Sequence, residues 1–120
     1  MHDTVARAPK QLFIAGTWRD ARDGVTFDVE DPATGEVLGP VADATVDDGV
    51  DAVVAAAAAQ DGWSGVPARR RGELLRAVFE RLTARADELA LLLTREMGKP
   101  LAEAWGEIAY AADFFRWFSE

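Results

Sequence analysis

The sequence predicts a mixed α/β segment in which two β-hairpins precede three or four helices. Short runs of alternating apolar and polar residues, separated by glycine and proline, occupy residues 12–41. From Thr45 onward the apolar residues instead recur at helical spacing. The chain has 120 residues, of which 49% are hydrophobic and 28% charged, and this is the size and composition of one small globular domain.

Two turns define the β region. The predicted strands cover residues 12–14, 17–18, 26–30 and 36–41. Gly16 can take the positive φ that a tight first hairpin needs. The second turn, residues 31–35, begins with Asp-Pro and closes with glycine, which is typical of a β-turn. Pro40 has no N–H to donate, so the returning strand is predicted at a sheet edge or ends there.

Helices are predicted over residues 45–62, over 67–98 as one helix or two, and over 100–120. Thr45 is a favourable N-cap, and Gly62 a plausible stop. A narrow core stripe is predicted on this first helix, at Val46, Val50, Val53, Val54 and Ala57. Asp87 is a candidate cap for a second helix within 67–98, whereas Gly98 ends that segment and Pro100 opens the next.

The last predicted helix is apolar nearly all round in its C-terminal half. Its main apolar face consists of Leu101, Ala104, Trp105, Ile108, Ala112 and Phe115. The opposite side carries Tyr110, Phe114 and Trp117. Each aromatic side chain can bury about 150–250 Å², worth roughly 4–6 kcal/mol as an upper bound. We therefore expect partner surface to cover this side, either more of the same chain or another subunit.

The residues offer no catalytic, cofactor-binding or metal-binding constellation. There is no cysteine, and the one histidine is His2. No G-x-G-x-x-G occurs, and Gly98-Lys99 is followed by proline rather than the Ser or Thr of a P-loop. The carboxylates of Glu103 and Glu107 share a helix face, and we expect this face to be exposed to solvent rather than catalytic. No catalytic residue and no metal ligand is therefore predicted.

Composition also bears on partners and location. The formal net charge is −8 and the pI is near 4.6, so nucleic acid is not an expected partner. The cluster Arg69-Arg70-Arg71 is predicted to be a solvated or salt-bridged helix face. No apolar run is long enough for a membrane span, and residues 1–11 read as a disordered lead-in rather than a secretory signal. A cytoplasmic location with no membrane partner is expected.

Three motifs in order carry a family resemblance. They are FIAGTW (13–18), DPATGEVLG (31–39) and EMGKPLAEAWGEIAYAADFFRWFSE (96–120). Over residues 12–120 the chain resembles the N-terminal part of aldehyde dehydrogenases, and its last segment is similar to the succinate-semialdehyde dehydrogenase branch. Asp31 stands where the family more often has asparagine.

The resemblance implies a Rossmann-like α/β parent several times longer, which uses NAD or NADP. Residues 12–120 would be the N-terminal part of its cofactor-binding domain, truncated within the last helix. A cysteine thiolate would attack a small-molecule aldehyde, an asparagine and a backbone N–H would stabilise the thiohemiacetal, and a glutamate would activate water. All these groups, and the cofactor-binding glycines, would lie beyond Glu120. The complete enzyme is expected to be a homodimer or homotetramer.

One pair of site residues follows from the same resemblance. The helix matching residues 100–120 borders the family's substrate tunnel, at positions that align with Gly106 and Tyr110. Gly106 would leave room and Tyr110 would help to line the tunnel. Alternatively, the aromatic side chains are ordinary core contacts with the rest of the chain. Two other interpretations stay open: a non-enzymatic interaction module that uses the aromatic helix, and a non-functional gene fragment.

Overall fold

Two β-hairpins are followed by a helical layer, as the sequence predicts. The computed structural model describes residues 2–120. Its elements are α1 (His2–Arg7), β1 (Leu12–Ile14), β2 (Thr17–Arg19), β3 (Thr26–Glu30), β4 (Val37–Ala42), α2 (Val46–Ser64), α3 (Ala68–Ala84), α4 (Ala86–Met97) and α5 (Leu101–Ser119). Four helices follow the hairpins, and this agrees with the expected three or four.

Each hairpin is a separate two-stranded antiparallel sheet. In β1–β2, Ala15 (φ 53°) and Gly16 (φ 80°) both have positive φ, as a tight two-residue turn requires. In β3–β4, Phe27 lies opposite Val41, and a bulge near Val29 shifts the register. The returning strand runs over 37–42 rather than the predicted 36–41. Pro40 lies in an edge strand, as predicted, because each sheet has two strands.

The helix ends confirm some predicted signals and correct others. Thr45 caps α2 in a reciprocal capping box with Asp48, and Gly98 ends α4 with a left-handed φ of 74°. However, α2 continues past Gly62 to Ser64, because Gly62 keeps helical geometry. Residues 68–97 form two helices that break at Arg85, which makes no side-chain cap, so the proposed cap at Asp87 is wrong.

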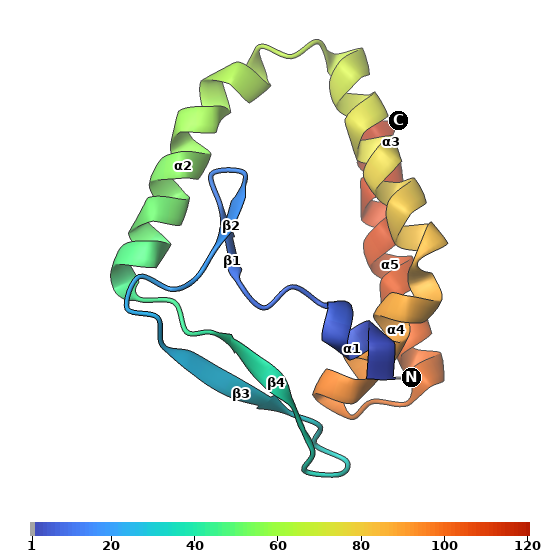
Figure 1. Ribbon diagram of the computed structural model, residues 1–120. Coiled ribbons are helices and arrows are strands. Elements are labelled where there is room, and N and C mark those ends of the chain that lie inside the picture. Colours follow the sequence, from blue (N-terminus) through green and yellow to red (C-terminus); the bar gives the residue numbers. More distant parts are fainter. Residues whose placement is uncertain (1) are drawn as a thin grey trace.

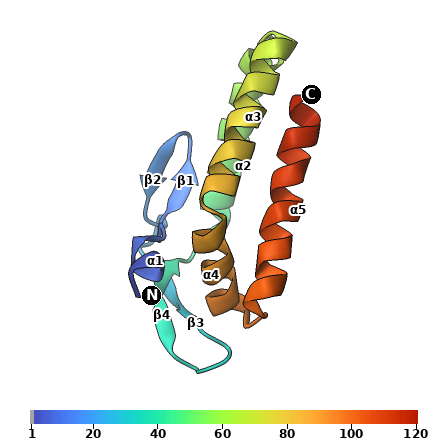
Figure 2. The ribbon, with the colours of Figure 1, turned by 90° about the vertical axis from the view of Figure 1, so that its right-hand side faces the viewer.

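The helical layer is built around small residues. Helix α5 packs along α3 and α4, and Figure 2 shows α5 running beside both of them. Ala104 and Ala112 of α5 and Ala90 of α4 are buried in this helical layer. Gly72 of α3 lies so close to the end of α5 that an added Cβ would be 2.7 Å from the Ser119 carbonyl oxygen. Small side chains thus let the helix axes approach closely.

The elements form an open frame rather than a closed core. In Figure 1, α2 forms one side and α3, α4 and α5 form the other, while β1–β2 lies between them and β3–β4 runs along the bottom. The radius of gyration is 16.8 Å, against about 13.6 Å for a compact domain of this length. The valines of the predicted α2 stripe are exposed, up to 86% at Val46. That stripe is therefore not a core among residues 2–120, because its valines stay exposed although β1 contacts α2.

The N-terminal residues differ from the expected disordered lead-in over 1–11. Residues 2–7 form α1, which packs against α4. Val5 is buried there, and Lys10 Nζ donates a hydrogen bond to its carbonyl oxygen at 3.0 Å. Residue 1 lies outside the described residues. Within residues 2–120, we find no helix with both the length and the apolar character needed to cross a membrane.

Candidate functional site

The most prominent candidate site is the uncovered side of α5. We call Tyr110, Phe114, Trp117 and Phe118 the aromatic face of α5. All four are exposed, from 49% at Phe114 to 75% at Trp117. Together with Asp113 they line a shallow hollow of about 410 Å³. The sequence pattern predicts this uncovered apolar side, and the structure shows that nothing in residues 2–120 covers it.

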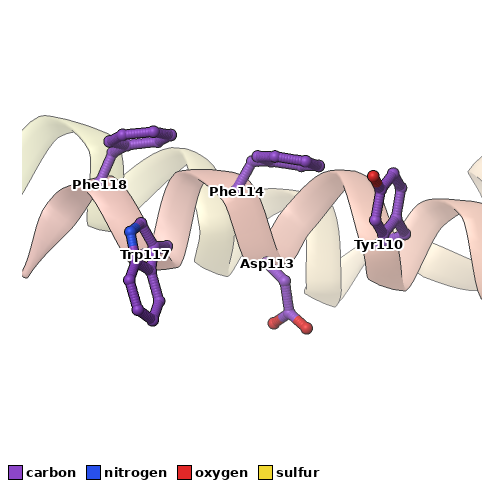
Figure 3. A pocket seen from close by; sticks show the side chains of 5 residues that line it. All are labelled: Tyr110, Asp113, Phe114, Trp117 and Phe118. Atoms are coloured by element: carbon purple, nitrogen blue, oxygen red, sulfur yellow. The ribbon is translucent and has the colours of Figure 1, made fainter.

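The aromatic face follows from helical spacing. Residues four apart lie on one side of a helix, and the rings of Tyr110 and Phe114 meet edge to face with centroids 4.9 Å apart. Figure 3 shows Phe114 and Phe118 along one edge of the helix, with Trp117 and Asp113 along the other. The surface is broad and apolar, with the Asp113 carboxylate at its margin. It can bind apolar groups, and its polar side-chain groups are the Tyr110 hydroxyl, the Trp117 indole N–H and the Asp113 carboxylate.

Gly106 lies one turn before Tyr110 on α5, on roughly the same side of the helix. A Cβ built on Gly106 would meet no atom within 4 Å, so the space beside it is open. The main apolar face of α5 turns instead toward α3 and α4, where Ala104 and Ala112 are buried. Leu101 and Trp105, which were predicted on that buried face, remain 47% and 42% exposed.

The other charged groups that the sequence singles out have structural partners. Arg69 and Arg70 pair with Glu73 at 3.3 and 3.2 Å, which confirms a salt-bridged helix face. Glu107 pairs with Lys99, so it is not a free catalytic carboxylate beside Glu103. Among the described residues, no group of three or more His, Cys, Asp or Glu could hold a metal ion.

A polar cluster that sequence analysis did not identify joins the first hairpin to α2. The Asp48 carboxylate is fully buried, and its Oδ2 accepts hydrogen bonds from the N–H of Arg22 (3.1 Å) and from the N–H and hydroxyl of Thr45. Arg19 Nη1 lies 2.7 Å from its Oδ1. These contacts, the Arg22 N–H first, hold the pKa of Asp48 well below its usual range despite burial. The Thr45-x-x-Asp48 capping pattern could have predicted the contact between these two residues. The contacts with Arg19 and Arg22 could not be predicted in this way, because the arginines are remote in sequence.

Comparison with known proteins identifies the family to which this chain belongs. The aldehyde dehydrogenase family model matches residues 18–120. The chain belongs to the aldehyde dehydrogenase family. Similar curated relatives include glutarate-semialdehyde dehydrogenase of Pseudomonas putida, 47% identical over 111 residues, and NADP(+) succinate-semialdehyde dehydrogenase of Escherichia coli, 44% identical over 111 residues. Each alignment covers 92% of this chain and 23% of the relative, so the chain spans about a quarter of their length.

Solved structures show the same fold. An E. coli NADP-dependent enzyme superposes with a TM-score of 0.89 at 44% identity, covering 92% of this chain and 23% of that one. Betaine aldehyde dehydrogenase of Staphylococcus aureus, in complex with NAD+, gives a TM-score of 0.93 at 28% identity, covering 98% of this chain and 24% of that one. The hairpins and helical layer are therefore part of the aldehyde dehydrogenase α/β fold, as the resemblance implied.

Proposed function

We propose that residues 12–120 are the N-terminal part of the cofactor-binding domain of an NAD(P)-dependent aldehyde dehydrogenase. Its substrate would be the semialdehyde of a dicarboxylic acid, succinate semialdehyde first, and its product the corresponding diacid. The observation that carries this proposal is the family match over residues 18–120, in a chain that spans about a quarter of its relatives. The substrate class rests on the succinate- and glutarate-semialdehyde activities named for those relatives.

The exposed apolar surfaces support the same proposal. The aromatic face of α5 and the valine stripe of α2 lie on an open frame whose radius of gyration exceeds that of a compact domain. Leaving so much apolar area in water costs free energy comparable to the stability of a whole domain. A continuation of the chain that packs into the frame would recover that free energy.

The reacting groups would lie in that continuation. The chain has no cysteine, so the thiolate that attacks the aldehyde must come from elsewhere. The residues present do not fit a dinucleotide either, because no G-x-G-x-x-G turn precedes a helix. The N-cap residues of α2, α3, α4 and α5 are Thr45, Pro67, Arg85 and Pro100. Bound NAD or NADP would serve as the hydride acceptor. The role of this segment would be to complete the fold and border the substrate tunnel at Gly106 and Tyr110.

The decisive experiment is to read the coding DNA beyond the codon for Glu120. An open frame that supplies Pro-Trp-Asn and Glu-Leu-Gly-Gly segments and then a cysteine would support the proposal. The encoded full-length protein should then oxidise succinate semialdehyde, measured as NADH or NADPH absorbance. A stop codon directly after Glu120, or a full-length protein inactive on semialdehydes with both cofactors, would contradict it.

Tyr110→Ala tests the tunnel in the full-length protein. We expect the KM for the aldehyde to rise about tenfold, because a lining ring worth roughly 1–2 kcal/mol of substrate contact is removed. Tyr110→Phe keeps the ring and should stay close to the unsubstituted protein. The thermal midpoint should be measured alongside the KM, because the side chain is 67% exposed in this segment and the continuation of the chain would cover it. Unchanged kinetics in Tyr110→Ala would favour the alternative that the aromatic face is a core contact.

A second candidate function is a non-enzymatic interaction module. The aromatic face and its hollow of about 410 Å³ would then be a surface for a protein partner. This candidate requires the stop codon after Glu120 and a stable monomer of 120 residues with a saturable partner. A protein that aggregates and binds no partner would instead indicate a non-functional fragment. A cytoplasmic location and a dimeric or tetrameric assembly remain predictions from the family.

A further inference from the structure

The β3–β4 turn is held against the end of α4 by three charged side chains, which we call the turn clamp: Asp31, Glu36 and Arg95. Asp31 is 5% exposed, and its Oδ2 lies 2.7 Å from Arg95 Nε in an ionic contact. Arg95 Nη2 donates to Glu36 Oε2 at 2.9 Å. The two carboxylates stand at the two ends of the turn, and one guanidinium bridges both of them. A cation in the last turn of α4 is also favoured by the helix dipole.

The same turn touches the link between α4 and α5. A Cβ on Gly98 would lie 2.9 Å from Pro32 Cγ, so the proline ring rests against the glycine backbone. Figures 1 and 2 both show the β3–β4 turn beside this link. Gly98 has a φ of 74°, so the chain reverses sharply here before Pro100 starts α5. The clamp therefore fixes the point from which α5 begins.

The position at which α5 begins determines where Gly106 and Tyr110 lie. Lys99 in the link pairs with Glu107, which ties the link to the second turn of α5. Gly106 and Tyr110 lie roughly 9 and 15 Å further along the helix axis than Pro100. Because a helix moves as a stiff rod, a shift at its start displaces both of these positions.

We propose that Asp31 is a positioning residue: through Arg95 it sets the placement of α5 and thereby the width of the aldehyde tunnel. This inference rests on the proposed function. An asparagine, which the family more often has at this position, could still accept the turn hydrogen bond that Asp31 Oδ1 takes from the Ala33 N–H (2.9 Å). It could not form the ion pair with Arg95. The Asp31 carboxylate thus forms an ion pair that links the turn to α4 and that the turn does not require for its own conformation.

Asp31→Asn in the full-length enzyme is the direct test, with Asp28→Asn as the matched control. Asp28 is an exposed carboxylate on the same hairpin. We expect Asp31→Asn to raise the KM for succinate semialdehyde about three- to tenfold while kcat and the cofactor KM stay within about twofold. A merely structural role would lower the active fraction, and hence kcat, without moving KM. Asp28→Asn should resemble the unsubstituted enzyme.

Amide hydrogen exchange gives a second readout that does not need activity. Residues 98–107 should exchange about tenfold faster in Asp31→Asn than in Asp28→Asn. Arg95→Lys, which cannot bridge both carboxylates, should behave like Asp31→Asn and serves in its place if that variant fails to fold. Aldehyde KM and exchange both unchanged in an active enzyme would overturn the clamp proposal. If amide exchange is faster in Asp31→Asn but the unsubstituted protein oxidises no aldehyde, the clamp is supported and the proposed function is rejected.

Discussion

Gly72→Ala is expected to destabilise the protein by about 1–3 kcal/mol, the usual cost of overpacking a close contact. The added methyl group would lie 2.7 Å from the Ser119 carbonyl oxygen, a backbone atom that cannot rotate away. The end of α5 would have to move away from α3. The shift in urea midpoint, followed by far-ultraviolet circular dichroism at constant m-value, measures the effect.

Gly62→Ala is the matched control, because the same substitution has the opposite expected sign. Gly62 lies inside α2 and a Cβ there would meet no atom within 4 Å. Alanine should therefore stabilise the helix by about 0.5–1 kcal/mol through backbone entropy. If both variants shift the midpoint in the same direction, the close contact between α3 and α5 is not as described.

The turns and helix ends could be predicted from the sequence because each depends on residues close to it in the chain. A turn glycine at Gly16, the N-cap at Thr45 and the left-handed Gly98 each act through neighbours a few residues away. The helix break at Arg85 was not resolved, since Arg85 carries no cap signal and Asp87 offered a misleading one. The end of α2 was predicted two residues too early for a related reason: a glycine such as Gly62 often ends a helix but can also lie within one at a small cost.

In the candidate site, too, features that follow from local sequence patterns were predicted, whereas contacts between residues far apart in sequence were not. The aromatic face of α5 was predicted because Tyr110, Phe114 and Trp117 recur at helical spacing opposite an apolar face. The contacts of Asp48 with Arg19 and of Asp31 with Arg95 were not predicted, because each joins groups on different elements far apart in sequence. The α2 stripe was correctly recognised as apolar, but its covering surface is not among residues 2–120. A periodic pattern shows that a face is apolar and does not show what covers it.

Asp48→Asn is expected to lower the free energy of unfolding by about 1–3 kcal/mol at pH 7, which is measured as a lower thermal midpoint. The Asp48 carboxylate is buried, and its Oδ2 accepts hydrogen bonds from Arg22 and Thr45, while Arg19 lies beside its Oδ1. An amide carries no charge to pair with Arg19 and presents a donor where these groups require an acceptor. Asp47→Asn is the control, because Asp47 is exposed on the same first turn.

The pH dependence separates the charge of Asp48 from its packing. Since the folded state holds the pKa of Asp48 below its ordinary value of 3.8, the carboxylate contributes its full stabilisation above that value. The contribution is lost progressively as the pH falls below about 4, because the unfolded state then binds a proton that the folded state, with its lowered pKa, does not bind. The difference in thermal midpoint between the unsubstituted protein and Asp48→Asn should therefore be constant from pH 8 to 5 and shrink toward pH 3. A difference that stays the same down to pH 3 would mean that Asp48 stabilises the hairpin and α2 by shape and not by charge.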